Sequence, residues 1–540
     1  MPGRSVVSIL LLLLLHGLLC LQLAALTEMD DDDVMEDGSC MHFSVSPPPA
    51  PPEDADERRD YFRAMQAKDL FRHEQMITMM GSDRNGSSRR RRAKESSKLP
   101  EVMSATSMFE LPMRSALNIA HVGMYLVSVR IGTPALPYNL VLDTATDLTW
   151  INCRLRRRKG KHYGRQSMGQ TMSVGGEGAT AAKKETRKNW YRPAKSSSWR
   201  RIRCSQKECA LLPYNTCQSP SKAESCSYYQ KTQDGTVTIG IYGKEKATVT
   251  VSDGRMAKLP GLILGCSVLE AGGSVDAHDG VLSLGNGEMS FAVHAAKRFG
   301  QRFSFCLLSA NSSRDASSYL TFGPNPAVMG PGTMETDIVY NVDVKPAYGP
   351  LVTGIFVGGE RLDIPHEIWD AEKVVGGGVI LDTSTSVTSL VPEAYAPVTT
   401  ALDRHLSHLP RVYELDGFEY CYKWTFTGDG VDPAHNVTIP SFTVEMAGGA
   451  RLEPEAKSVV MPEVVPGVAC LAFRKLPRGG PGILGNVLMQ EYIWEIDHGK
   501  GKMRFRKDKC NTHHLHNSKG GEVYNNNNGN SSSTVVHRVN

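Results

Sequence analysis

Apolar and polar residues alternate in several short stretches of this chain, a pattern typical of β-strands with one buried face. Residues 125–131 alternate in this way and end in the turn Gly132-Thr133-Pro134, and residues 248–251 repeat the pattern. Short β-type runs also precede residue 382. Pro392 is predicted to open a helix, because proline is favoured at the first helical position. The pattern therefore predicts a β-rich segment that begins near residue 120.

Two similar stretches lie about 240 residues apart within this segment. In each, an apolar strand-like run ends in Asp-Thr-x-Thr, at residues 143–146 and again at residues 382–385. One such run is common at strand ends, but two in one chain suggest a duplicated fold with one carboxylate in each half. Two carboxylates that are brought together cannot easily both ionise. Such a pair can act as general acid and general base on one bound water.

The two stretches resemble the Asp-Thr/Ser-Gly-Ser/Thr loops of pepsin-like aspartic endopeptidases, specifically the plant nepenthesin-like branch. Trp150 and Cys153 follow the first loop as they do in that family, and the Gly265-Cys266 strand and residues 279–285 and 303–307 match in order and spacing. The resemblance covers residues 120–511. It implies an all-β, bilobal pepsin-like fold of two β-barrels, with a cleft between the lobes and one Asp loop from each lobe at its floor.

The resemblance also assigns roles to individual residues. Asp143 and Asp382 would be the catalytic pair, and no cofactor or metal would be needed. The remaining assignments are loop braces (Thr144, Thr383), outer donors to the carboxylates (Thr146, Thr385), a flap hairpin after Cys226 (Thr232, Asp234, Gly235) and a disulfide (Cys421, Cys470). The family's flap tyrosine falls at Thr232 in this chain.

Three glycines of the family pattern are replaced in this chain. Ala145 and Ser384 follow the two Asp-Thr pairs, and Ser283 stands where a strand crosses behind the first loop, so that only Gly485 remains. A side chain at such a position can move a carboxylate by up to about 1 Å, which can cost on the order of 100-fold in rate. Two hypotheses follow. The chain is either an aspartic endopeptidase that cleaves polypeptides at acidic pH, with weakened activity, or a catalytically impaired secreted binding or inhibitor protein on the same scaffold.

The chain divides into five expected segments: a signal peptide (1–26), a polar propeptide-like segment (27–115), an N-terminal lobe (116–335, with a basic insertion at 154–190), a C-terminal lobe (336–511) and a disordered tail (512–540). The signal peptide has Arg4, an apolar core at 9–15 and small residues at 23–26. Its apolar run is short for a spanning helix, which needs about 20 residues. We therefore expect no membrane span and a secretory-pathway protein, either extracellular (apoplast or cell wall) or vacuolar.

The propeptide-like segment carries one predicted amphipathic helix, over residues 56–80. Its apolar members are Tyr61, Phe62, Met65, Leu70 and Phe71. A basic helical prosegment can cover an acidic cleft by charge complementarity. Four arginines at 89–92 are either a processing site or part of a solvated basic linker.

The composition and charge of the chain indicate its cellular compartment and its possible partners. Ten of the twelve cysteines lie between Cys153 and Cys510, which is compatible with five disulfides in an oxidising compartment. Asn311 and Asn436 begin glycosylation sites. The net charge of +4 gives no general case for nucleic-acid binding. Residues 154–203 hold 16 Lys/Arg and 2 acidic residues, so the insertion is either a solvated loop or a site for an acidic ligand. We expect a monomer.

Overall fold

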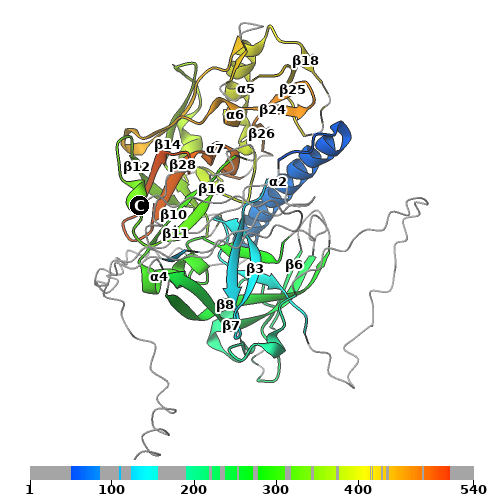
Figure 1. The fold of residues 1–540 in the computed structure, drawn as a ribbon, viewed down its shortest axis with the longest axis vertical. Helices are drawn as coiled ribbons and strands as arrows, with labels where there is room; N and C mark the ends of the chain where they lie inside the picture. The colour runs from blue at the N-terminus through cyan, green and yellow to red at the C-terminus, as the bar shows by residue number, and fades with distance from the viewer. Residues whose placement is uncertain are drawn as a thin grey trace, which may run out of the picture.

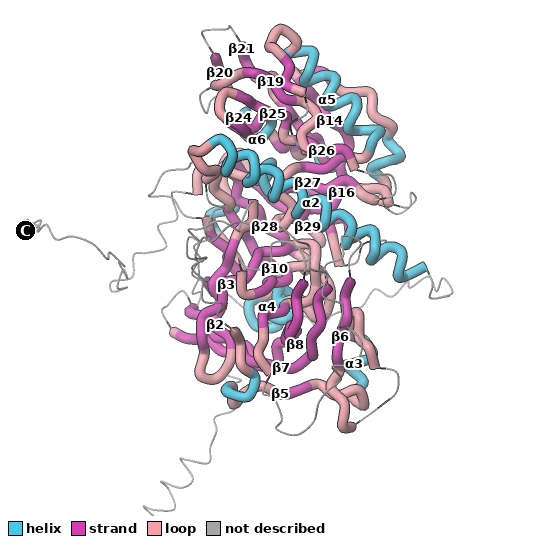
Figure 2. Tube along the Cα trace, turned by 90° about the vertical axis from the view of Figure 1, so that its right-hand side faces the viewer, coloured by secondary structure: helices cyan, strands magenta, loops and turns pink. Residues whose placement is uncertain are grey.

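The computed structural model describes residues 50–84, 109–110 and most of 123–510, with the larger gaps at 156–189, 272–277 and 310–317. Two β-rich lobes lie one above the other, and helix α2 (Ala55–Arg84) runs between them in both views (Figures 1 and 2). The predicted all-β, bilobal fold is confirmed. The predicted signal peptide, the arginines at 89–92, the predicted glycosylation sites and the predicted tail lie outside the described residues.

A closed barrel forms the core of the first lobe. Its strands are β2 (Leu126–Ile131), β3 (Leu136–Asp143), β4 (Trp150–Asn152), β7 (Val237–Val251), β8 (Met256–Ala271) and β9 (Gly280–Ser283). They pair in the order β7-β2-β3-β9-β4-β8, and β8 pairs again with β7. The β2–β3 turn needs a glycine, because Gly132 has a φ of +95°. Closure removes the free edges of the sheet.

The same sheet continues into the second lobe. The additional strands are β1 (Phe109–Glu110), β10 (Arg302–Cys306), β11 (Tyr319–Phe322), β12 (Met334–Tyr340), β13 (Tyr348–Pro350), β28 (Tyr492–Asp497) and β29 (Lys502–Lys507). Strand β10 pairs antiparallel with β28, which lies about 190 residues later in the chain. Trp494 of β28 is fully buried and stacks on Phe505. The two lobes therefore share one continuous hydrogen-bonded framework.

Smaller elements complete the first lobe. They are β5 (Arg200–Arg201) and β6 (Ser227–Lys231), both paired with β7, together with α3 (Lys207–Leu211), α4 (Phe291–Phe299), η1 (Pro193–Lys195) and η2 (Pro326–Val328). The β6–β7 hairpin is the one predicted after Cys226.

The second lobe is built from four smaller sheets. Their strands are β14 (Val352–Val357), β15 (Glu360–Arg361), β16 (Val379–Asp382), β17 (Thr388–Leu390), β18 (Arg411–Val412), β19 (Cys421–Lys423), β20 (Val431–Asp432), β21 (Val437–Thr438), β22 (Phe442–Met446), β23 (Arg451–Leu452), β24 (Val460–Val465), β25 (Val468–Leu471), β26 (Phe473–Lys475) and β27 (Gly482–Gly485). Its helices are α5 (Pro392–Leu406), which begins at the predicted Pro392, α6 (Ala456–Val459), α7 (Asn486–Met489), η3 (His366–Trp369) and η4 (Ala447–Gly449). Of the described helices, none is long and apolar enough to cross a membrane.

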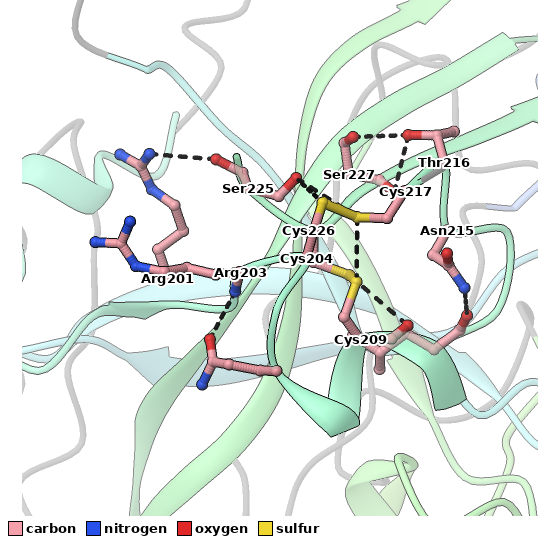
Figure 3. Close-up of a disulfide and its surroundings, with 12 residues drawn as sticks. Arg201, Arg203, Cys204, Cys209, Asn215, Thr216, Cys217, Ser225, Cys226 and Ser227 are labelled. Atoms are coloured by element: carbon pink, nitrogen blue, oxygen red, sulfur yellow. Dashed lines mark hydrogen bonds between the residues drawn. A yellow bond between two sulfur atoms is a disulfide. The ribbon is translucent and has the colours of Figure 1, made fainter. Parts of the chain in front are cut away.

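Five disulfides join the ten cysteines that follow Cys40. They are Cys153–Cys266, Cys204–Cys217, Cys209–Cys226, Cys306–Cys510 and the expected Cys421–Cys470. Two of them lie side by side near α3 (Figure 3). Because these bonds form and persist in oxidising compartments, they fit a protein of the secretory pathway.

The basic insertion leaves the barrel and returns to it at one point. The Tyr191 N–H donates to the Asn152 carbonyl at 2.9 Å, and the Arg154 N–H donates to the Tyr191 carbonyl at 2.8 Å. Tyr191 is buried, and Cys153 beside it is bonded to Cys266. Residues 156–189 themselves lie outside the described part of the chain.

Candidate active site

The two Asp loops are built alike. Strands β3 and β16 end at Asp143 and Asp382, and each runs parallel to a strand, β9 or β27, that crosses behind the loop. Six residues after each aspartate, a threonine hydroxyl accepts a hydrogen bond from that crossing strand. Thr149 accepts from the Ser283 N–H at 3.2 Å, and Thr388 accepts from the Gly485 N–H at 3.1 Å. This repeated construction supports the interpretation of a duplicated fold.

Two threonines hold the loops against each other. The Thr144 hydroxyl donates to the Leu381 carbonyl at 2.8 Å, and the Thr383 hydroxyl donates to the Leu142 carbonyl at 2.9 Å. The Thr383 N–H also donates to the Thr144 hydroxyl oxygen at 3.1 Å. Each loop is therefore fixed by the backbone of the other, in the arrangement predicted for Thr144 and Thr383.

One guanidinium group contacts both carboxylates. Arg72 of α2 donates from Nη2 to Asp143 Oδ1 at 2.6 Å and from Nε to Asp382 Oδ2 at 3.0 Å. All three side chains are buried. Buried charges require such partners, because an unpaired charge away from water is very costly. The structure thus brings the two predicted aspartates together and adds a cation that no sequence motif indicated.

The two carboxyl groups have different proton affinities. Burial raises the pKa of Asp143 to about 6, with the Arg72 charge opposing this shift and the Asp382 charge adding to it. Burial also acts on Asp382, but the Arg72 charge and the hydrogen bonds from Thr385 and Ser384 outweigh it and hold the pKa of Asp382 below its ordinary value. Asp143 therefore takes up a proton more readily than Asp382.

The hydroxyl donors explain part of this difference. Thr385 donates to Asp382 Oδ2 at 2.7 Å, as predicted, and the Ser384 hydroxyl donates to Asp382 Oδ1 at 2.8 Å. In the described part of the chain, Thr146 lacks the corresponding bond. Within the described residues its hydroxyl makes no hydrogen bond, and its loop is fixed through the backbone instead, because the Gly285 N–H donates to the Thr146 carbonyl at 2.8 Å.

The residues that replace glycine are accommodated without an unpaired polar group. The Ser283 hydroxyl is fully buried, lies 2.8 Å from the Thr149 hydroxyl and accepts the Phe291 N–H at 3.0 Å. Ala145 packs in an apolar cluster that includes Met76 of α2. At Gly485 the glycine is required, because a Cβ would lie 2.5 Å from the Ser386 carbonyl oxygen.

Helix α2 presents a mixed face to the two Asp loops. Its buried residues follow helical spacing and change from apolar to charged and back: Phe62, Met65, Gln66, Asp69, Arg72, His73 and Met76. The predicted helix is confirmed, with bounds Ala55–Arg84. Leu70, predicted as an apolar member, is 47% exposed, because Asp69 and Arg72 define the buried face around it. The burial of Phe71 lies outside what the structure describes.

A second set of contacts from α2 reaches the loop after Asp382. Asp69 accepts the N–H groups of Ser386 and Val387 at 2.9 and 2.8 Å. Lys68 Nζ donates to the Ser386 hydroxyl at 2.6 Å and lies 3.2 Å from Asp69. Asp69 is fully buried and therefore takes the place that water or a ligand backbone would otherwise occupy against these two amides.

The hairpin over this region is only partly described. Strands β6 and β7 pair from Ser227↔Ile241 to Lys231↔Val237. Thr232, Asp234 and Gly235, the predicted flap residues, lie outside the described residues. Near the hairpin base, Tyr228 is buried against Tyr242, with ring centroids 4.8 Å apart.

Comparisons with known proteins agree with this architecture. Two family profiles match, one described as xylanase inhibitor N-terminal over residues 125–324 and one as xylanase inhibitor C-terminal over residues 347–507. Aspartyl protease family protein 2 of Arabidopsis thaliana is 28% identical over 389 residues, covering 72% of this chain and 71% of that protein. Aspartic proteinase nepenthesin-2 of Nepenthes gracilis is 27% identical over 371 residues, covering 68% and 74% of the two chains.

Solved structures show the same fold at low sequence identity. The crystal structure of edgp matches with a TM-score of 0.56 at 16% identity, over 75% of this chain and 95% of that one. Basic 7S globulin from soybean matches with a TM-score of 0.53, also at 16% identity and with the same coverage. Together with the paired Asp loops, these findings show that the chain belongs to the pepsin-like aspartic protease family.

Proposed function

We propose that this protein is an aspartic endopeptidase of the secretory pathway, which uses Asp143 and Asp382 to activate one water molecule against a peptide bond. One carboxylate takes a proton from the water as the water oxygen bonds to the carbonyl carbon. The other carboxyl group donates its proton to the carbonyl oxygen, so that a neutral gem-diol forms. The carbon–nitrogen bond then breaks as the amine nitrogen is protonated. No covalent enzyme intermediate is required.

The observation that carries this proposal is the buried carboxyl pair itself. Asp143 and Asp382 contact the same guanidinium, and their loops are fixed by reciprocal threonine bonds. Burying two like charges at a common point is costly, and such arrangements cluster at functional sites. A carboxyl pair held this close can share one proton, which is the state required for general acid–base catalysis at acidic pH, and even with α2 docked Asp143 has the higher pKa of the two. A carboxyl pair that shares one proton is the established feature of aspartic proteases as a class.

We also propose that α2 keeps the enzyme inactive until it leaves the cleft. Arg72 covers both carboxylates, and Asp69 covers two backbone amides beside them. A peptide and its attacking water need this space. Arg72 and the loop hydroxyls hold the pKa of Asp382 below its ordinary value in the docked state, so acidification that protonates Asp382 weakens docking.

The test is cleavage of an unfolded protein substrate at pH 3 to 6 by the secreted, processed chain. We expect cleavage that pepstatin blocks and that Asp143→Asn abolishes, since the amide keeps the size of the side chain but cannot exchange the proton. Cleavage by the Asp143→Asn variant at the parent rate would refute the proposal. So would an inactive parent whose circular dichroism and disulfides show that it is folded.

The second candidate function is a binding or inhibitor protein on the same scaffold. Ala145 and Ser384 stand at glycine positions of the family loops, and both matching profiles are described as xylanase inhibitor domains. A folded, processed and proteolytically inactive sample that inhibits a xylanase at stoichiometric amounts would favour this function over the protease.

We further propose an acidic ligand at the base of the basic insertion. A hollow of about 690 Å³ is lined by Trp199, Arg200, Arg201, Arg203 and Ala223. In the described part of the chain, these three guanidinium groups bond only to hydroxyl or carbonyl oxygens, for example Arg201 Nη1 to the Ser225 hydroxyl at 3.2 Å (Figure 3). Exposed guanidinium groups beside an indole suit an acidic sugar polymer, because carboxylates can pair with the cations and the ring can stack.

Binding of polygalacturonate tests this site. Replacing the three arginines of the hollow by Gln should weaken binding at least tenfold. A charge-matched control, with Arg404, Lys423 and Lys475 of the second lobe replaced by Gln, should bind like the parent. Equal weakening in both variants would mean that only net charge attracts the polymer.

A further inference from the structure

Ser384 is the residue whose observed role differs most from its sequence interpretation. As a replacement for glycine it suggested damage to the site. In the structure it lies two residues after Asp382 and is buried. Its N–H and its hydroxyl both donate to Asp382 Oδ1, at 3.0 and 2.8 Å. The side chain therefore adds a donor that glycine cannot supply.

The other loop lacks a matching donor. Ala145 occupies the position equivalent to Ser384, and its N–H donates to Asp143 Oδ1 at 2.9 Å, but its methyl group donates nothing. Asp382 thus accepts two loop hydroxyls, from Ser384 and Thr385, one on each oxygen. Among the described residues of its own loop, no hydroxyl donates to Asp143. The two loops share their backbone geometry and differ in their side chains.

Hydroxyl donors favour the ionised form of the carboxylate that accepts them. Hydrogen bonding from the Ser384 hydroxyl also lowers the pKa of Asp143, but it is the weakest of the effects on that carboxyl group, after burial, the Arg72 and Asp382 charges and the Ala145 N–H. Among the described residues, three charged groups face Asp382: Arg72, Lys68 and Asp143. Arg72 and Lys68 belong to α2, so of the three only Asp143 remains beside Asp382 after the helix has been released. When α2 has left, the loop donors remain as a difference between the two aspartates.

We propose that Ser384 is a positioning residue that keeps the negative charge on Asp382 and the shared proton on Asp143. This inference rests on the proposed function and assigns its two roles. Asp382 takes the proton of the attacking water. Asp143 gives its proton to the carbonyl oxygen of the substrate. After the gem-diol has formed, Asp382 is protonated and Asp143 is ionised, so all protons are accounted for.

The first measurement is the pH profile of kcat/KM for the processed parent, Ser384→Ala and Ser384→Thr. Ser384→Ala keeps the Cβ and removes only the hydroxyl, so the acid limb, which reports protonation of Asp382, should move up by about one pH unit. The basic limb, which reports Asp143, should move less. Ser384→Thr retains the hydroxyl and should keep the acid limb of the parent. A loss by the same factor at every pH in Ser384→Ala would overturn the proposal.

The second measurement does not depend on turnover. In protein labelled with ¹³C at the aspartate carboxyl carbons, the Asp382 signal is the one absent from Asp382→Asn. We expect it to titrate below the Asp143 signal and to move to higher pH in Ser384→Ala. If the parent cleaves nothing and this shift is still seen, the proposed function has failed while the placement of the charge stands. A titration of Asp382 that Ser384→Ala leaves unchanged would refute the positioning role.

Discussion

Acid release of helix α2 should depend strongly on His73. This side chain lies in the buried face of α2, next to Arg72 in sequence, and is only 2% exposed. Within the described chain neither ring nitrogen has a hydrogen-bond partner. Burial, assisted by the nearby Arg474 charge, lowers the pKa of His73 from 6.5 to about 4. His73 is therefore neutral while α2 is docked, and it takes up a proton more readily once the helix is released.

The size of the effect follows from the two pKa values. They differ by about 2.5 pH units (6.5 minus about 4), and at 1.36 kcal/mol per unit the full difference is about 3.4 kcal/mol. The docked pKa is the lower one, so His73 places no proton-linked penalty on docking well above pH 6.5. The penalty develops as the pH falls from 6.5 to about 4. At pH 5 it should weaken docking about 30-fold, or about 2 kcal/mol.

Hydrogen–deuterium exchange of the α2 amides in the intact chain measures this docking. Protection, corrected for the intrinsic exchange rate, should fall between pH 7 and pH 5 in the parent, because the released helix takes up a proton at His73 more readily than the docked helix does. Over this pH interval, the free energy of docking α2 should fall by about 2 kcal/mol less in His73→Leu and in His73→Gln than in the parent. The comparison uses the change with pH, since Leu also alters docking at pH 7. The reasoning would be refuted by variants whose protection falls with pH as steeply as that of the parent.

Three further changes test other contacts. Arg72→Gln should weaken docking of α2 at pH 7 by about 3 kcal/mol, because it leaves two buried carboxylates without their cation. The control Arg63→Gln, on the exposed side of α2, should change docking by less than about 1 kcal/mol. Amide exchange measures both effects. Thr383→Val should lower the free energy of unfolding by about 1–3 kcal/mol in denaturant titrations, because it leaves a buried carbonyl of β3 unpaired, and an unchanged midpoint would contradict the bracing role. Ser283→Gly restores the family residue, yet it should lower the free energy of unfolding by about 1–3 kcal/mol, because the first N–H of α4 loses its acceptor. A more stable variant would show that the glycine fits better.

Local patterns predicted several elements of this protein, and the resemblance to a known family supplied the bilobal framework. The strand before Gly132, the helix at Pro392 and the two Asp loops each depend on neighbours within about ten residues, and all are found where the sequence places them. The even number of cysteines after Cys40 likewise agrees with five disulfides. The pairing of β10 with β28 depends on residues far apart in the chain and could not be read from alternation.

The charged contacts of the site were missed for a physical reason. Apolar periodicity placed Leu70 on the buried face of α2, whereas the residues that face the cleft at this level are Asp69 and Arg72. A buried charge is stable only with partners, and the partners of Arg72 lie 71 and 310 residues later. The useful signal was the helical spacing of Met65, Asp69 and Arg72, read without regard to polarity. Ser384 was misjudged similarly, because its hydroxyl has an acceptor only in the folded loop.

The two ends of the basic insertion are hydrogen-bonded to each other where they join the barrel. Because Asn152, Arg154 and Tyr191 are hydrogen-bonded to one another, the ends of the insertion are held together independently of what lies between them. The entropy of closing a loop grows only slowly with its length. A change in the length of the segment between these residues should therefore add little to the entropy of closing the loop. The site is a natural point for attaching a label or an affinity tag, and for changing the surface charge of the protein while the Asp loops stay intact.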